Sequence, residues 1–180
     1  MSLEFFLQNI IFDASLAAAA VLFYLFNKKK PVKELFLEKP KSMRRELKNT
    51  LVLTGALVLA SIAIGLLLYP FGLNDSAKAI EKIAEVKEMG LFFLIYLFTV
   101  RVAVEEVFFR GLLTRKTGVI ISSIIFGLSH FAYGSAIELI GATALGAILA
   151  IAFNKNRSIY SNILAHSAYN FITLAMAGLI

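Results

Sequence analysis

The sequence predicts an all-α, polytopic membrane protein: one bundle of about six transmembrane helices with a short amphipathic helix. Of the 180 residues, 59% are hydrophobic, and the mean hydropathy is +0.79, well above the balance of a soluble domain. Apolar runs close to the roughly 20 residues needed to cross a bilayer recur along the chain. Because no long polar or Pro/Gly-rich linker divides these runs, residues 1–180 are predicted to form a single transmembrane domain.

The predicted spans are residues 5–26, 50–71, 89–112, 118–132, 135–153 and 159–180. The first span is interpreted as an uncleaved anchor, since it lacks a basic start and carries Glu4 and Asp13 early. Residues 74–90 combine both signs of charge with apolar residues at near-helical spacing, which predicts the amphipathic helix.

Half of the chain's 18 Lys and Arg residues lie in the polar segment 28–48. They are Lys28, Lys29, Lys30, Lys33, Lys39, Lys41, Arg44, Arg45 and Lys48. The positive-inside rule places this segment in the cytoplasm, together with the turns at residues 115–116 and 155–157. We therefore predict a multi-pass protein of the cell membrane with both termini outside.

Composition also limits the partners and cofactors. The net charge of +6 is accounted for by topology, and the aromatic residues lie in apolar runs, so lipid rather than nucleic acid is the expected partner. Cysteine is absent, which excludes disulfides and thiolate metal ligands. The sequence leaves the oligomeric state open.

Four ionisable groups interrupt the third apolar run, VRVAVEEVFFRGLL at residues 100–113. A charge at the centre of a membrane helix costs about 2.5–3.5 kcal/mol, so such groups usually have a function. The i,i+4 spacing predicts ion pairs of Arg101 with Glu105 and of Glu106 with Arg110. We interpret Glu106 and Arg110 as bracing the helix near the cytoplasmic face and Arg101 as a counter-charge, whereas Glu105 must face the bundle interior or a wet cavity.

The only two histidines, His130 and His166, both fall in predicted spans. Counted from Gly118 and Ser158 at 1.5 Å per residue, they lie about 18 and 12 Å deep, close to the roughly 7 to 15 Å expected for Glu105. We predict that these three residues share a cavity open toward the cytoplasm. Each histidine taken alone also fits a purely structural role.

Two neighbours complete the pattern. Phe126 precedes His130 by four residues and is expected to pack and orient its helix. Asn170 follows His166 by four residues on the same face, where it either joins helices or polarises a carbonyl group.

EEVFFR (Glu105–Arg110), FGLSH (Phe126–His130) and HSAYN (His166–Asn170) resemble, in order, the three signature motifs of the CPBP intramembrane protease family. That family includes the type II CAAX prenyl endopeptidases and bacterial proteins of bacteriocin processing and self-immunity. The resemblance covers roughly residues 90–180 as a catalytic core and leaves residues 1–89 as variable N-terminal helices.

The resemblance implies an endopeptidase that cuts a membrane-associated peptide or lipidated protein, with prenylated CAAX proteins as one candidate class. Glu105 would act with His130 to activate a water molecule, while His166 and Asn170 would stabilise the oxyanion. Glu105, His130 and His166 would also make a zinc-ligand set, without the H-E-x-x-H pattern of soluble zinc proteases. A divalent metal therefore stays open, and a glutamate-activated water is preferred.

Two alternatives remain at this point. A non-catalytic immunity or binding scaffold would keep the same fold. A small proton-coupled transporter would use Glu105, His130, His166 and Glu138 as a titratable path. The transporter predicts a continuous polar route through the bundle, whereas the protease predicts a cavity closed from outside.

Overall fold

The computed structural model describes residues 3–26, 40, 42–73, 75, 77–78, 80–81, 84 and 90–178. Within these ranges every regular element is a helix, which confirms the predicted all-α class. The elements are α1 (Leu3–Phe26), α2 (Met43–Leu68), the 3-10 turn η2 (Tyr69–Phe71), α4 (Leu91–Tyr96), η3 (Leu97–Arg101), α5 (Val102–Glu106), η4 (Val107–Thr114), α6 (Arg115–Leu128), the 3-10 turn η5 (Phe131–Tyr133), α7 (Ala136–Asn156) and α8 (Ile159–Met176).

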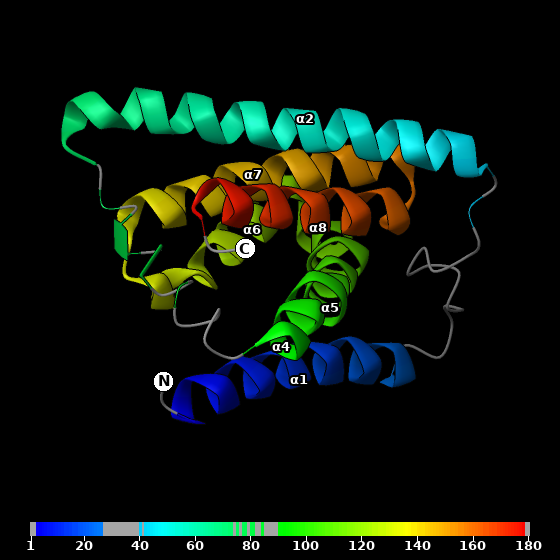
Figure 1. The fold of residues 1–180 in the computed structure, drawn as a ribbon. Coiled ribbons are helices and arrows are strands. Elements are labelled where there is room, and N and C mark those ends of the chain that lie inside the picture. Colours follow the sequence, from blue (N-terminus) through cyan, green and yellow to red (C-terminus); the bar gives the residue numbers. More distant parts are fainter. Residues whose placement is uncertain are drawn as a thin grey trace.

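The helices are arranged with α1 and α2 on opposite sides of the molecule (Figure 1). Helices α6, α7 and α8 lie beneath α2, and the segment from α4 to η4 runs obliquely from α1 toward them (Figure 1). This segment is helical throughout, but η3 and η4 have π-helical hydrogen bonding.

Helices occupy all of the predicted apolar runs, with shifted ends. Helix α2 begins at Met43 rather than at residue 50, because Ser42 caps it by accepting a hydrogen bond from the Arg45 backbone N–H at 3.3 Å. The end of the predicted polar loop is thus helical. The rest of that loop, and most of the predicted amphipathic helix at 74–90, lie outside the described residues.

The fourth predicted span also differs from the structure. Gly118 has φ 81°, so the helical path breaks there, where the sequence placed the start of the span. Helix α6 ends at Leu128, and His130 adopts φ −93° and ψ 5° in the turn before η5. His130 was predicted to be inside a span and instead lies just past the end of its helix.

Two of the described helices are long and apolar enough to cross a membrane, Met43–Phe71 and Ala136–Asn156. Much of α2 is exposed, including Leu51, Leu59 and Leu66. Such a long exposed apolar surface on a well-packed bundle is typical of contact with lipid. The membrane location is supported in this way, and the total of about six spans remains a prediction.

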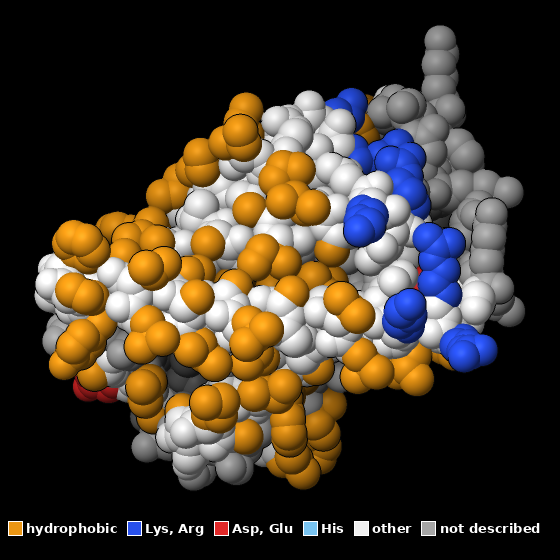
Figure 2. Space-filling view, turned by 90° about the horizontal axis from the view of Figure 1, so that it is seen from above, with side chains coloured by type: hydrophobic (Ala, Val, Ile, Leu, Met, Phe, Trp, Pro, Cys, Tyr) orange, Lys and Arg blue, Asp and Glu red, His pale blue; other side chains and the backbone are white. Residues whose placement is uncertain are grey.

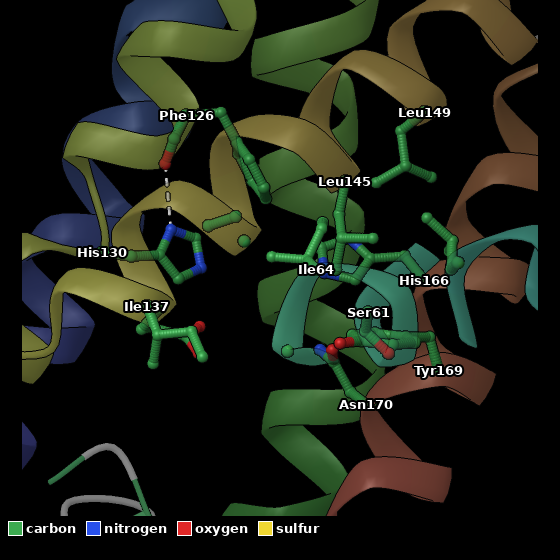
Figure 3. A pocket seen from close by; sticks show the side chains of 15 residues that line it. Ser61, Ile64, Phe126, His130, Ile137, Leu145, Leu149, His166, Tyr169 and Asn170 are labelled. Atoms are coloured by element: carbon green, nitrogen blue, oxygen red, sulfur yellow. Dashed lines mark hydrogen bonds between the residues drawn. The ribbon is translucent and has the colours of Figure 1, made fainter. Parts of the chain in front are cut away.

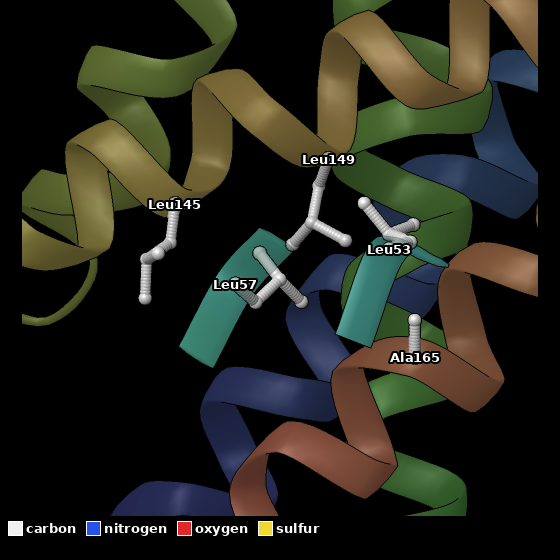
Figure 4. Packing of buried hydrophobic residues seen from close by; sticks show 5 residues of the cluster. All are labelled: Leu53, Leu57, Leu145, Leu149 and Ala165. Atoms are coloured by element: carbon white, nitrogen blue, oxygen red, sulfur yellow. The ribbon is translucent and has the colours of Figure 1, made fainter. Parts of the chain in front are cut away.

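The core that joins α2, α7 and α8 is built from aliphatic side chains. Leu53 and Leu57 of α2 interdigitate with Leu145 and Leu149 of α7, and Ala165 of α8 lets the helices approach closely (Figure 4). A second cluster joins α1 and η4 to α6 and α7 through Leu16, Phe109, Phe126 and Ala142. Together the two clusters hold the polar motifs between fixed helices.

Basic side chains gather at one end of the bundle. Seen from above α2, Lys and Arg lie at the end where α2 begins, and hydrophobic side chains cover most of the remaining surface (Figure 2). The exposed basic residues near that end are Arg44, Arg45, Lys48, Arg115, Lys116, Lys155 and Arg157. We call this the basic end; it is the end predicted to be cytoplasmic.

Candidate active site

The two adjacent glutamates lie on the short helix α5, between the π-helical segments η3 and η4. Both are buried, with Glu105 4% and Glu106 0% exposed. A π-helical turn inserts an extra residue into a helix and often occurs at functional sites. Both predicted i,i+4 ion pairs are present: Arg101 Nε lies 3.0 Å from Glu105 Oε1, and Arg110 NH1 lies 3.2 Å from Glu106 Oε1.

Glu106 connects three elements. Its Oε1 lies 2.9 Å from His166 Nδ1, and its Oε2 accepts a hydrogen bond from Asn162 Nδ2 at 3.2 Å. Because a carboxylate only accepts, Nδ1 of His166 carries the proton. Nε2 of His166 is then left to interact with another group.

Arg110 is buried along its whole length, with 1% of its surface exposed. Its guanidinium carbon lies 4.2 Å from the centroid of the Phe126 ring, in a cation–π contact, in addition to the ion pair with Glu106. Phe126 therefore contacts the charged network directly, and its ring also lies against His130 and His166, with centroid distances of 4.8 and 6.0 Å.

Glu105 belongs to a separate network that reaches α1. Arg101 lies between Glu105 and Asp13, with its Nε 3.9 Å from Asp13 Oδ1. The Tyr96 hydroxyl donates to Asp13 Oδ2 at 2.7 Å. Asp13 is 3% exposed, so helix α1 contributes a buried carboxylate to the surroundings of Glu105.

His130 is held by its own helix. Its Nδ1 lies 2.9 Å from the Phe126 carbonyl oxygen, and its ring stacks on Tyr133 with centroids 5.8 Å apart. Since a carbonyl oxygen only accepts, Nδ1 carries the proton and Nε2 is the free acceptor of the neutral ring. The F-x-x-x-H spacing thus orients the imidazole through a backbone bond as well as through packing.

The two imidazoles and Asn170 line one cavity of about 320 Å³ (Figure 3). His130 lies on one side of the cavity, His166 and Asn170 lie across it, and Tyr169 and Ser61 are next to Asn170 (Figure 3). Glu105 is not among the lining residues, although it lies within electrostatic range of both histidines. The structure thus brings three of the four predicted catalytic residues to one cavity, with the fourth buried nearby.

The cavity has one closed end. Leu57, Leu145 and Leu149 are buried and apolar and pack together (Figure 4). They line the cavity and form its floor. Ile137 and Glu138, in the first turn of α7, line the opposite and partly exposed end. The partly exposed end of the cavity therefore lies away from the basic end.

The candidate zinc-ligand set of Glu105, His130 and His166 is not assembled in this structure. Among the described residues, no group of three or more His, Asp or Glu side chains is placed to hold a metal ion. Glu105 pairs with Arg101 instead, whereas the Nδ1 bonds of His130 and His166 leave Nε2 of each ring available to another group. A divalent metal is therefore not assigned.

Three participating residues were missed in the sequence. Asn162 precedes His166 by one helical turn and bonds both Glu106 and the Leu149 carbonyl oxygen, the latter at 2.8 Å. A buried amide on the histidine face was the available signal. Asp13 and Tyr96 were also missed, although an acidic residue inside a predicted span indicates a function by the same rule applied to Glu105.

Residues 87–172 match the family model described as type II CAAX prenyl endopeptidase Rce1-like. The chain carries an Rce1-like domain. The match confirms the resemblance drawn from the three motifs, and it contains Glu105, His130, His166 and Asn170. No curated protein and no solved structure matches the chain. The Rce1-like family model implies a membrane-embedded protease that acts on a peptide or protein substrate.

Proposed function

We propose that the protein is an intramembrane endopeptidase that hydrolyses a peptide bond of a membrane-associated substrate with a water molecule activated by Glu105 and His130. The observation that carries the proposal is the cavity on which His130, His166 and Asn170 converge inside an Rce1-like domain. Peptide hydrolysis needs a base for the water proton and donors for the developing oxyanion.

His130 is suited to receive the proton from water. Its Nδ1–H bond to the Phe126 carbonyl leaves Nε2 as the acceptor. Glu105 is buried within electrostatic range of this ring, where its negative charge favours the imidazolium that forms when the proton is taken. The guanidinium of Arg101, whose Nε lies 3.0 Å from Glu105 Oε1, partly neutralises that negative charge.

His166 and Asn170 are proposed to bind the oxyanion. Both line the cavity from α8, and the Glu106 carboxylate orients the His166 ring through Nδ1. Removing one such donor typically costs about 2.7–4 kcal/mol of transition-state stabilisation. No metal step is required by this arrangement.

The apolar floor formed by Leu57, Leu145 and Leu149 argues against the transporter alternative, since it interrupts any polar route along the cavity. A non-catalytic scaffold would have the same fold as a peptidase, so only a measurement of peptide cleavage distinguishes the two.

The test is cleavage of candidate membrane peptides by the purified protein, compared with Glu105→Gln, His130→Ala and His166→Ala. Glu105→Gln and His130→Ala are expected to lose about 10²- to 10⁴-fold in kcat/KM, the usual contribution of a general acid–base group. His166→Ala is expected to lose about 10²- to 10³-fold, the usual contribution of one oxyanion donor. Lys155→Ala, at the exposed basic end, is the matched control and should cleave like the parent. Three folded variants that cleave as fast as the parent would overturn the assignment, and retained peptide binding without cleavage by the parent would favour the scaffold.

A further inference from the structure

The exposure of the cavity lining changes along its length. Leu145, Leu149 and His166 are buried at one end, whereas Glu138 and Gly141 are partly exposed at the other. The exposure of the α2 residues that line the cavity increases in the same direction, from buried Leu57 to partly exposed Gly65. A substrate therefore reaches the histidines from the Glu138 end.

That end is far from the basic end. Glu138 and Lys155 lie near opposite ends of α7, so they are separated by about 25 Å at 1.5 Å per residue. Helix α2 runs in the opposite direction, from Arg44 in its first turn toward Gly65 near its end, about 30 Å along the axis. The lining residues of α7 and those of α2 therefore both place the partly exposed end of the cavity far from the basic end.

The distribution of charged residues indicates which side of the membrane the basic end and the Glu138 end face. Basic residues at the start of α2, at the start of α6 and at the end of α7 lie at the basic end. Such clusters stay on the cytoplasmic side of a membrane. The Glu138 end then faces away from the cytoplasm.

The chemistry of the lining narrows the substrate further. Among the described lining residues, Glu138 is the only carboxylate, and Lys and Arg are absent. A carboxylate at the entrance attracts a cationic side chain and repels a free terminal carboxylate. An internal segment with a basic residue fits this cavity better than the extreme C-terminus of a chain.

We propose that the substrate is an internal peptide segment at the non-cytoplasmic face of the membrane, with a Lys or Arg next to the scissile bond that pairs with Glu138. The choice of substrate rests on the proposed peptidase function, whereas the side of access rests on the geometry of the cavity and on the positive-inside rule. The two parts are tested separately.

The side of access is tested by cysteine labelling, for which the cysteine-free chain is suited. Gly141→Cys and Gly65→Cys each introduce a thiol into the lining, and a Cβ at either position meets nothing within 4 Å. Lys155→Cys is the control at the basic end. In intact cells, a membrane-impermeant maleimide is expected to label the two cavity cysteines and not the control, and inverted vesicles should give the reverse pattern.

Each outcome of the labelling bears on the proposal. Labelling of the cavity cysteines only in inverted vesicles overturns non-cytoplasmic access, as does failure of both to react in intact cells. Labelling does not need cleavage, so its failure leaves the peptidase function standing, and an inactive parent leaves the labelling result standing.

The substrate class is tested by charge reversal. The parent is expected to prefer a peptide with Lys beside the scissile bond over a matched peptide with Glu at that position, and Glu138→Lys is expected to invert the preference. Glu138→Gln should abolish the preference while cleaving both peptides. An unchanged preference in both variants would overturn the role of Glu138, even if cleavage itself persists.

Discussion

The Glu106 carboxylate contacts three side chains. The sequence assigned it to a local ion pair with Arg110, and that pair is present at 3.2 Å. The structure adds His166 and Asn162 to the same carboxylate. Bracing the helix and orienting an imidazole are therefore performed by the same side chain.

Glu106→Gln is expected to destabilise the protein by about 3–5 kcal/mol, because it leaves the buried Arg110 without a counter-charge. The double variant Glu106→Gln, Arg110→Met removes both charges and should recover part of this loss. Thermal unfolding in detergent of the parent, both single variants and the double variant measures the coupling. Strictly additive effects would contradict an energetic role for the pair.

At the scale of elements, the close contact between α6 and α7 depends on Gly127. A Cβ at this position would overlap the Thr143 hydroxyl and lie 3.0 Å from the Leu139 carbonyl oxygen. The absence of a side chain thus sets the distance between the helix that precedes His130 and the helix that lines the cavity.

Gly127→Ala is expected to destabilise the protein by about 1–3 kcal/mol, as overpacking does in other cores. Gly141→Ala, on α7, is the matched control, because its Cβ meets nothing within 4 Å and alanine favours the helix by up to about 1 kcal/mol. Unfolding midpoints of the two variants should move in opposite directions. A Gly127→Ala protein as stable as the parent would mean that the helices separate without cost.

Helix α7 begins at a cap supplied from a distant part of the chain. The Asp75 carboxylate accepts hydrogen bonds from the backbone N–H groups of Ala136 at 2.8 Å and Ile137 at 3.2 Å, and from the Ser135 hydroxyl at 2.9 Å. The two backbone bonds are the main cause that holds the Asp75 pKa below its ordinary 3.8. The cap fixes the turn of α7 that carries Glu138.

Because the folded pKa of Asp75 is lower than the unfolded one, the cap stabilises the protein fully above the unfolded pKa. This contribution is lost as the pH falls through the folded pKa. Unfolding midpoints measured from about pH 6 down to about pH 2 should fall less steeply in Asp75→Asn than in the parent. Identical slopes in the two proteins would show that the cap does not contribute.

At the scale of the whole molecule, an apolar surface lies next to a basic end (Figure 2). Arg44 and Arg45 are exposed at the start of α2, at the level expected for lipid headgroups. Juxtamembrane basic residues attract anionic lipid by about 1 kcal/mol each.

Replacing Arg44 and Arg45 with glutamine is therefore expected to weaken binding of an anionic phospholipid by about 1 kcal/mol per charge, or about fivefold each. Native mass spectrometry with graded lipid concentrations measures the effect. Lys78→Gln removes an exposed charge far from the basic end and is the control. An equal loss in the control would indicate a general charge effect.

The sequence predicted the helical class, the positions of the helices and the two ion pairs, because hydrophobic run length and i,i+4 spacing are local properties. Depth along a helix also brought His130 and His166 correctly to one level. Rotation about each helix axis is not a local property, so the sequence could not show that Glu105, paired with Arg101 as predicted, is absent from the cavity lining. The side of the opening is not a local property either, because it depends on which helix ends leave space between them.

The π-helical segments on both sides of α5 limit which insertions and deletions the segment from Glu105 to Arg110 can tolerate. Within η4, residues five apart come into register, as the 2.8 Å bond from the Thr114 hydroxyl to the Phe109 carbonyl oxygen illustrates. Loss of one residue between Glu106 and Arg110 would shorten their spacing from four residues to three, which turns Arg110 by about 100° relative to Glu106 on an α-helix. Single-residue insertions and deletions in this stretch are therefore expected to be far less tolerated than substitutions, since a change in chain length alone would separate the carboxylate from its arginine.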